Sequence, residues 1–275
     1  MMKKTKILLA TALLALSASV LAADVQVEQG AIGRWAGAEA TNCFFLGKSY
    51  KPVDGACYYP VDMAKRPAVY EIARTVNGVL ETASLEVIEK PCELEEIDFP
   101  KEEYVNLSPE DANRHWGEQA EVKSVLRQTR PRDPEFSLAL GKPSSPLPNG
   151  DNFGVCRKFN DIDKNRHTGI DYPVGMGNNV LSVAAGTVSL TGDHFFSGQS
   201  VYVNHGNGLT TMYFHLSEIN VAKGDKVQKG DSIGKIGSTG RSTGPHLHLG
   251  ARWLNQRINP NLLMTDPASY PQVNK

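Results

Sequence analysis

The stretch GPHLHLGARW, residues 244–253, has the alternating apolar pattern of a β-strand, and two histidines stand one residue apart in it. In a β-strand successive side chains point to opposite faces, so His246 and His248 face one space while Leu247 and Leu249 face the other side. Two imidazoles in one space predict a metal site, an acid–base pair or a polar surface stripe. Other histidines and carboxylates in the chain must distinguish these three.

Two upstream segments supply the missing partners. HTGIDYPVG places His167 and Asp171 four residues apart, and MYFHLS contributes His215 on a predicted strand. Two imidazoles and one carboxylate make a three-ligand zinc site that leaves a fourth tetrahedral position for water. A histidine that lies beside that water without binding the metal can transfer protons. Because His246 and His248 share a face, one can be the ligand and the other its neighbour.

Taken together, HTGIDYPVG, YFHLS and GSTGRSTGPHLHLG resemble the motifs of the lysostaphin-type peptidoglycan endopeptidases, the M23 or LytM-domain metallopeptidases. The likeness covers roughly residues 137–263, and the separated motifs occur in the same order. It implies an antiparallel β-sheet core with a narrow groove walled by loops. It also implies one zinc ion per chain and two catalytic histidines: the ligands are His167, Asp171 and His248, and the catalytic residues are His215 and His246.

The chain departs from the family pattern at two places. The Phe-Gly-x-Arg element that precedes the first ligand in relatives occurs here with one extra residue, between Phe153 and Arg157. GMGNNV stands where relatives often carry Gly-Thr-Pro. Both departures lie outside the expected metal ligands, so they concern the shape of the groove rather than the chemistry.

The resemblance implies a zinc-dependent endopeptidase that hydrolyses peptide cross-links of bacterial peptidoglycan, with the D-alanine–diaminopimelate link as the first choice. Zinc lowers the pKa of a bound water toward about 7 and polarises the scissile carbonyl, while His215 and His246 steer protons. Two alternatives stay open. A secreted glycyl-glycine endopeptidase would attack other bacteria, and a non-catalytic LytM-type protein would activate cell-wall amidases through the same groove.

The fold class predicted from the whole chain is mainly β. Residues 24–98 contain short alternating runs broken by turn residues, and Asn77-Gly78 between two such runs is a strong hairpin signal. This part is interpreted as an N-terminal β accessory domain. Glycine-punctuated strands return near Phe136, and residues 136–265 are interpreted as the metallopeptidase domain.

One helix is predicted between these parts. Ser108 is a natural N-cap, Pro109 suits the first helical position, and acidic residues fill the first turn. A helix is therefore expected over about 109–128, and residues 99–135 are interpreted as a helical linker.

The first 22 residues have the pattern of a cleaved secretory signal. A basic start is followed by an uncharged apolar run from Ile7 to Val20 and by small residues up to Ala22. That run is short for a membrane span, and no later stretch is apolar enough to cross a bilayer. The mature protein is therefore expected to be periplasmic or secreted, without a membrane span.

Four cysteines fit an oxidising compartment and permit two disulfides in three pairings. Proximity favours Cys43 with Cys57, which leaves Cys92 and Cys156 as the second pair. A four-cysteine zinc site is the rival, but no C-x-x-C spacing supports it.

Charge is distributed unevenly along the chain. Residues 24–150 carry 14 basic and 21 acidic side chains, a net charge of −7, whereas residues 151–275 carry 12 and 9, a net charge of +3. This balance excludes a strongly basic nucleic-acid binder. The opposite signs lead to the expectation that the N-terminal domain docks over the groove, and the peptidoglycan stem peptide is the expected partner.

Three further histidines are assigned minor roles. His205 is interpreted as structural, His194 as a candidate for lining the groove, and His115 on the predicted helix as solvent-facing.

Overall fold

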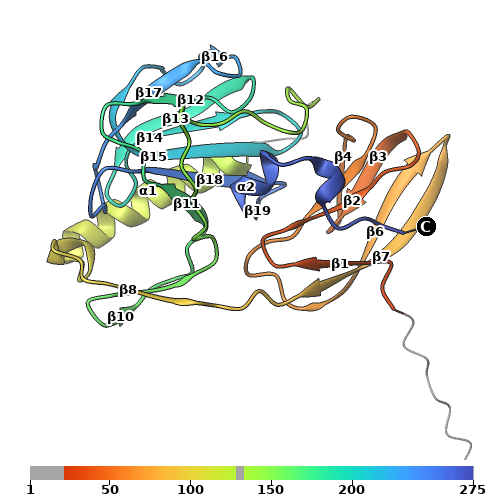
Figure 1. Ribbon diagram of the computed structural model, residues 1–275, viewed down its shortest axis with the longest axis horizontal. Coiled ribbons are helices and arrows are strands. Elements are labelled where there is room, and N and C mark those ends of the chain that lie inside the picture. The colour runs from red at the N-terminus through yellow and green to blue at the C-terminus, as the bar shows by residue number, and fades with distance from the viewer. Residues whose placement is uncertain (1–21, 128–132, 275) are drawn as a thin grey trace, which may run out of the picture.

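The computed structural model describes residues 22–127 and 133–274, and these are folded mainly into β-strands (Figure 1). The mainly β fold class is therefore confirmed. The predicted signal segment, apart from its last residue, lies outside the described residues.

The N-terminal half is built around a five-stranded sheet in the order β1-β7-β6-β3-β4. Asn77 and Gly78 connect β6 to β7 with φ values of 51° and 78°, the positive values that a type I′ turn requires. The predicted hairpin is confirmed. The strand bounds are β1 Val25–Glu28, β3 Ala40–Phe45, β4 Lys48–Tyr50, β6 Ala68–Val76 and β7 Val79–Ile88.

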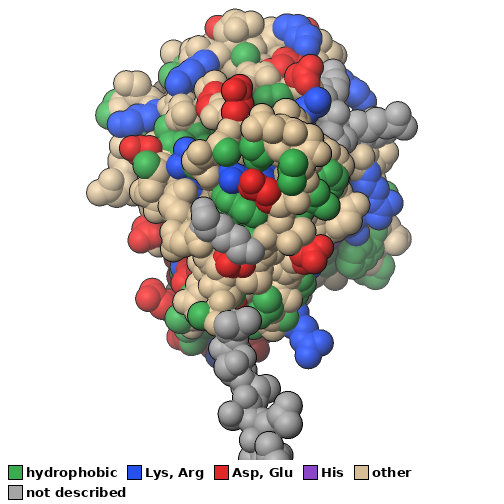
Figure 2. Space-filling model, turned by 90° about the vertical axis from the view of Figure 1, so that its right-hand side faces the viewer, with side chains coloured by type: hydrophobic (Ala, Val, Ile, Leu, Met, Phe, Trp, Pro, Cys, Tyr) green, Lys and Arg blue, Asp and Glu red, His purple; other side chains and the backbone are tan. Residues whose placement is uncertain are grey.

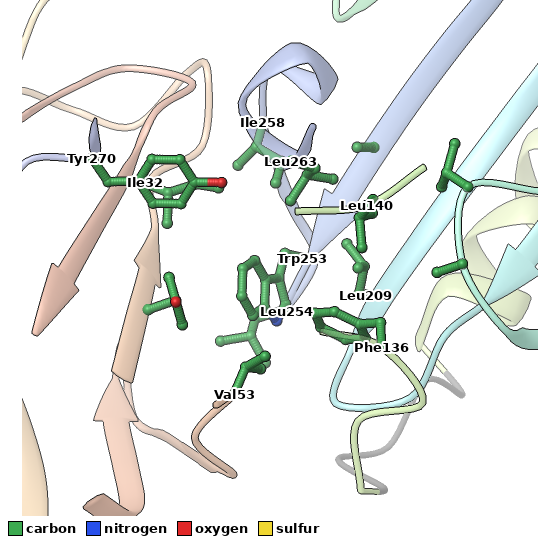
Figure 3. Close-up of a cluster of buried hydrophobic side chains, with 14 of the residues drawn as sticks. Ile32, Val53, Phe136, Leu140, Leu209, Trp253, Leu254, Ile258, Leu263 and Tyr270 are labelled. Atoms are coloured by element: carbon green, nitrogen blue, oxygen red, sulfur yellow. The ribbon is translucent and has the colours of Figure 1, made fainter. Parts of the chain in front are cut away.

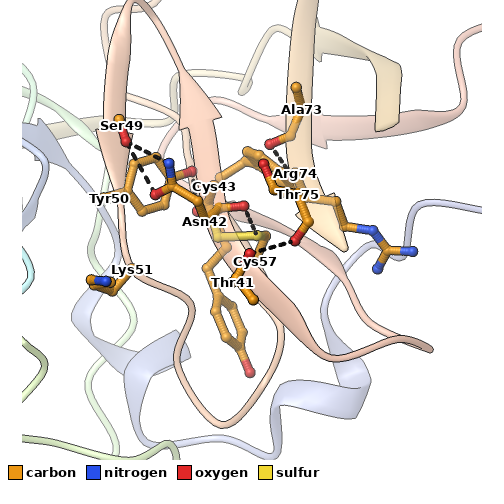
Figure 4. The surroundings of a disulfide bond; sticks show 12 residues. Thr41, Asn42, Cys43, Ser49, Tyr50, Lys51, Cys57, Ala73, Arg74 and Thr75 are labelled. Carbon is orange, nitrogen blue, oxygen red and sulfur yellow. Dashed lines mark hydrogen bonds between the residues drawn. A yellow bond between two sulfur atoms is a disulfide. The ribbon is translucent and has the colours of Figure 1, made fainter. Parts of the chain in front are cut away.

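A disulfide between Cys43 and Cys57 links this sheet to a second, two-stranded sheet (Figure 4). The second sheet pairs β2, Ile32–Trp35, with β5, Cys57–Pro60. The two cysteines are fully buried, so the disulfide closes the interior between the sheets. The other disulfide joins Cys92 to Cys156, and both pairings are those expected from the sequence.

The C-terminal half contains a nine-stranded sheet in which every pairing is antiparallel. Its main path runs β11-β18-β15-β14-β13-β16, with β12, β17 and β19 attached at the side. The predicted antiparallel core is confirmed. The strand bounds are β11 Gly169–Tyr172, β12 Asn179–Leu181, β13 Gly186–His194, β14 Gly198–Asn204, β15 Leu209–Ile219, β16 Lys226–Val227, β17 Ser232–Ile236, β18 Leu247–Trp253 and β19 Gln256–Arg257.

The segment between the two halves forms a small sheet and a long helix. Strand β8, Leu94–Ile97, pairs with β9, Cys156–Phe159, which also pairs with β10, Ile162–Asp163. A short 3-10 helix η1, Glu102–Tyr104, leads to helix α1, Pro109–Arg127.

Helix α1 begins where the sequence predicts. The hydroxyl of Ser108 accepts a hydrogen bond from the backbone N–H of Asp111 at 3.1 Å, which satisfies one of the free donors of the first turn. The apolar side of the helix packs on the nine-stranded sheet through Val125, which joins Leu190, Tyr202 and Met212 in one buried cluster. The helix is thus held against the C-terminal half.

The two halves share a continuous apolar core, and Trp253 lies at its centre (Figure 3). The indole of Trp253 is fully buried, stacks on Tyr58 at 5.5 Å between ring centroids, and donates a hydrogen bond to the carbonyl of Asn207. Phe136 packs edge-on against the same indole. The N-terminal sheets therefore bury one end of β18 rather than standing apart as a separate body.

The chain after β18 returns to the N-terminal half and reinforces this junction. Arg257 donates two hydrogen bonds from its side chain to the carboxylate of Asp62, and the backbone N–H of Val273 donates to the carbonyl of Arg34. The C-terminus accordingly lies beside the N-terminal strands (Figure 1). Two short helices occur on this path, α2 Pro260–Leu263 and η2 Pro267–Ser269.

The surface of the N-terminal half carries acidic and basic side chains mixed with apolar ones (Figure 2).

Within residues 22–127 and 133–274, no helix is both long and apolar enough to span a membrane.

We predict that Trp253→Ala lowers the free energy of unfolding by about 3–5 kcal/mol, because it opens a large cavity between the two halves. The matched control is Trp116→Ala on α1, where 64% of the side chain is exposed and a change within about 0.5 kcal/mol is expected. Urea unfolding followed by fluorescence measures both. Equal losses in the two variants would show that the shared core does not depend on Trp253.

Candidate active site

Two neighbouring strands place a carboxylate and an imidazole side by side. Strand β11 pairs antiparallel with β18, and the register sets Asp171 directly opposite His248. Oδ1 of Asp171 lies 2.8 Å from Nδ1 of His248. Glycine is required at position 169, because a Cβ there would lie 2.3 Å from Nε2 of His248.

His167 completes a group of three side chains that fits a metal ion. Its Nε2 lies 3.0 Å from Nδ1 of His248 and 3.3 Å from Oδ1 of Asp171. Ligands about 2.0–2.1 Å from a tetrahedral zinc ion are separated by about 3.3 Å, so the three atoms lie near the corners of such a site. Nδ1 of His167 donates to the carbonyl of Asn152 at 2.9 Å, which leaves the lone pair on Nε2 for a metal.

His215 and His246 lie beside this group, and a backbone carbonyl holds the Nδ1 of each ring. Nδ1 of His215 donates to the carbonyl of Thr239 at 2.8 Å, and Nδ1 of His246 donates to the carbonyl of Gly244 at 2.8 Å. The two rings are 4.7 Å apart between centroids. Both backbone contacts fix the tautomer with a lone pair on Nε2, which is the form that accepts a proton.

A backbone irregularity turns His215 into the site. Phe214 pairs with His248 and stacks on its ring at 5.1 Å, so regular alternation would send the next side chain to the opposite face. Instead His215 adopts a positive φ of 65°, within a register shift between β14 and β15. This left-handed conformation is costly for a residue other than glycine and is typical of functional sites.

The outer oxygen of Asp171 is held by two residues that sequence reasoning did not assign to the site. Nη2 of Arg157 donates to Oδ2 at 2.7 Å, and Nδ2 of Asn152 donates to it at 3.1 Å. Arg157 also pairs with Glu95 at 2.7 Å. The Phe-Gly-x-Arg element of the family ends at Arg157, so the sequence contained a sign of this role. The extra residue in that element does not prevent Arg157 from binding Asp171.

The surroundings of Asp171, His215 and His248 shift the pKa of each side chain. Burial alone would raise the pKa of Asp171, but hydrogen bonds with His167 and His248 outweigh it and hold that pKa far below its usual range. Burial lowers the pKa of His215 to about 3, helped by His246 and His248, and burial lowers the pKa of His248 to about 4. At neutral pH both imidazoles therefore retain lone pairs.

A cleft of about 720 Å³ lies over these residues. One part of its wall is the loop 241–246, and another is helix α1, through residues that include His115, Glu118 and Val122. Glu118 fixes the helix to the opposite loop by accepting a hydrogen bond from the backbone N–H of Phe195 at 2.8 Å.

The expected docking of the N-terminal β domain over the groove is not what the structure shows. Among the described residues before α1, those that line the cleft are on or just after β8, and none comes from the five-stranded sheet. That sheet is held at the Trp253 end of β18 by the shared core. The predicted linker, rather than the predicted accessory sheet, borders the cleft.

The remaining three histidines lie outside the group of five, two of them in the wall of the cleft. His115 does not face solvent, because its ring packs edge-on against Phe196 at 4.6 Å and lines the cleft. His194 also lines the cleft, where its Nδ1 bonds to the hydroxyl of Ser200. His205 is structural as expected: it is buried between the carbonyl of Ala185 and the hydroxyl of Thr211.

Part of the chain that forms the cleft is similar to a described peptidase family. The model of Peptidase family M23 matches residues 165–260, which contain all five of the residues predicted to act in the site. The DD-carboxypeptidase/endopeptidase Mpg of Neisseria meningitidis is 47% identical over 109 residues, which are 40% of this chain and 25% of Mpg. The peptidoglycan DD-endopeptidase ShyA of Vibrio cholerae is 46% identical over 82 residues, 30% of this chain and 19% of ShyA.

One solved structure is similar along most of the chain. A candidate M23 peptidase from Pseudomonas aeruginosa superposes with a TM-score of 0.65 and 27% identity, over 86% of this chain and 94% of that one. By contrast, the match to Mpg spans only a quarter of its length.

We predict that Arg157→Met weakens zinc binding by about 10- to 100-fold, because Asp171 loses the hydrogen bond that orients its carboxylate. Lys158→Met on the same strand is the matched control, since Lys158 lies 4.0 Å from Glu96 and does not line the cleft. Competition with a chromophoric chelator measures both affinities, and thermal unfolding verifies that each variant is folded. Equal affinities in the two variants would remove Arg157 from the support of the site.

Proposed function

Because residues 165–260 form a peptidase domain of family M23, we propose that the protein is a zinc-dependent endopeptidase that hydrolyses peptide cross-links of bacterial peptidoglycan. The observation that carries the proposal is the convergence of His167, Asp171 and His248 in one cleft, with two further histidines beside them. In this proposal the three residues bind one zinc ion per chain, and His215 and His246 are the catalytic residues.

The side chains of the cleft supply the parts of a hydrolytic reaction. A zinc ion bound there contributes Lewis acidity toward the scissile carbonyl and lowers the pKa of water. Nε2 of His246 lies 3.7 Å from Oδ1 of Asp171, so this imidazole is next to the proposed metal ligands. His246 or His215 accepts a proton from the attacking water and returns it to the leaving amine, and the protonated imidazole stabilises the developing oxyanion. No covalent enzyme intermediate is required.

The proposed bond is the direct cross-link between D-alanine and diaminopimelate. Mpg and ShyA, the relatives with 47% and 46% identity in the catalytic segment, are named for DD-carboxypeptidase and DD-endopeptidase activity. The secretory pattern of residues 1–22 and the two disulfides support action in the periplasm or outside the cell.

Two other functions are weighed against this one. A non-catalytic activator of amidases has no need for metal ligands, yet here His167, Asp171 and His248 keep ligand atoms within 4.8 Å of one another. A secreted glycyl-glycine endopeptidase would use the same catalytic residues on a different cross-link. The substrate therefore distinguishes the endopeptidases, and metal content distinguishes both from an activator.

Digestion of purified muropeptides tests the proposed function. The zinc-loaded protein without residues 1–22 is expected to split D-alanine–diaminopimelate dimers into monomers, with the mass of one water added per bond, and to leave oligoglycine-bridged dimers intact. The His246→Ala variant is the control for a contaminating peptidase. Cleavage of the oligoglycine bridge alone, or cleavage of neither dimer, would refute the proposed substrate.

Substitution of His246 and substitution of His248 are predicted to have different effects on zinc content. His248→Ala leaves two protein ligands and is expected to lose zinc on dialysis together with activity, as are His167→Ala and Asp171→Ala. His246→Ala and His215→Ala are expected to retain zinc while turnover falls by about 10²–10⁴-fold. Metal analysis of each dialysed variant, beside its rate on the dimer, checks the assignment. Loss of zinc in His246→Ala with retention in His248→Ala would reverse the two roles.

A further inference from the structure

A positively charged side chain in the cleft has no acidic partner. Arg241 lines the cleft close to the catalytic histidines, and its guanidinium lies over the ring of Phe196 at 4.3 Å and the ring of Phe159 at 4.9 Å. Among the residues that the structure describes, the Arg241 side chain makes no hydrogen bond or ion pair. Five N–H donors are thus held in a half-buried place without an acceptor.

The other cations that line the cleft are engaged elsewhere. Arg157 pairs with Glu95 and Asp171, and Arg257 pairs with Asp62. The remaining three donate to oxygens of nearby residues: Lys164 to the carbonyl of Val105, Arg166 to the carbonyl of Lys90 and Arg252 to the side chain of Asn255. Arg241 is therefore the one cleft-lining cation, within the described ranges, that has its full donor set available.

The acidic residues of the cleft do not supply the missing partner. Glu95 is bound to Arg157, and Glu118 is bound to Arg114 at 2.8 Å. Asp171 belongs to the metal group. Burial and the charge of Arg157 lower the pKa of Arg241 to about 10, so the guanidinium remains charged at neutral pH.

The backbone around Arg241 is positioned by two loops in close contact. Its N–H donates to the carbonyl of Phe196 at 2.9 Å. At the neighbouring Gly240, where φ is +66°, a Cβ would lie 2.4 Å from the backbone nitrogen of Gly198, so only glycine lets the loops meet. The same loop supplies the Thr239 carbonyl that orients His215. The position of Arg241 is therefore tied to that of the catalytic histidines.

We propose that Arg241 binds a free carboxylate of the substrate, namely the one on the carbon that carries the nitrogen of the scissile amide. This inference rests on the proposed function. In a D-alanine–diaminopimelate cross-link, the diaminopimelate carbon that bears the amide nitrogen also bears a free carboxylate. A guanidinium matches a carboxylate with two parallel N–H···O bonds, and the surrounding aromatic rings reduce competition from water. An oligoglycine bridge has no charge at the corresponding carbon, so Arg241 provides selectivity for the direct cross-link.

A comparison of acid and amide substrates tests the proposal. The acid is a cross-linked dipeptide dimer with this carboxylate free, and the amide is the same dimer with a carboxamide at that carbon. The wild-type zinc-loaded protein is expected to cleave the acid with a kcat/KM about 10- to 100-fold above that for the amide, the range for a hydrogen bond between charged groups. Arg241→Met is expected to lower the rate on the acid far more than the rate on the amide, so that the preference for the acid is lost. Arg241→Lys is expected to restore part of the preference.

The control is Arg34→Met, which also removes a guanidinium from above an aromatic ring, that of Tyr58 at 5.9 Å, but lies on β2 outside the cleft. It is expected to keep the full preference for the acid. Thermal unfolding confirms that each variant is folded. Equal rates on acid and amide in the wild type, or an unchanged preference in Arg241→Met, would overturn the assignment of Arg241.

Binding separates this inference from the proposed function. Calorimetry with zinc-loaded His246→Ala measures the affinity for both dimers without turnover. This variant is expected to bind the acid about 10- to 100-fold more tightly than the amide. The double variant with Arg241→Met is expected to lose that difference in affinity. Selective binding without cleavage by the wild type would refute the proposed function alone. Cleavage with equal binding of acid and amide would refute the role of Arg241 alone.

Discussion

The antiparallel pairing of β11 with β18 is the constraint on which the rest of the site depends. It sets Asp171 opposite His248, and a shift by one residue would turn one of the two side chains to the other face of the sheet. The pairing also brings Gly169 against the His248 ring, where no larger residue fits. His167, immediately before β11, reaches the same point because its ring is anchored to the backbone of Asn152. The geometry of the proposed metal site is thus a consequence of strand register.

Strand β18 connects the proposed metal site to the apolar core that the two halves share. Strand β18 carries His248 near its start and ends at Trp253, whose indole is buried by both halves. The N-terminal sheets therefore hold the far end of the strand that bears His248, a ligand in the proposed metal site. This arrangement gives the N-terminal half a structural role at the junction, where Tyr58 stacks on Trp253 and Asp62 binds Arg257.

The opposite net charges of the two halves predicted that the N-terminal domain covers the cleft. The segment between the halves lies there instead. Net charge describes long-range attraction but does not say which surface is in contact, and here the contacts are apolar packing and a hydrogen bond. Val125 packs against the sheet and Glu118 holds the backbone of Phe195. Helix α1 is consequently a wall of the cleft, and His115 faces that cleft rather than solvent.

The sequence by itself determined the features that depend on local chemistry. Alternation in PHLHL put two histidines on one face, Ser108 started the helix, and Asn77-Gly78 formed the turn, since each depends on neighbours in the chain. Only the tertiary structure decided the contacts between distant segments. These are the orientation of His215 by a positive φ, the support of Asp171 by Arg157, the place of α1 along the cleft and the stacking of Arg241 on Phe196. Each depends on how separate strands and loops pack together, and residue order does not encode that packing in any local pattern.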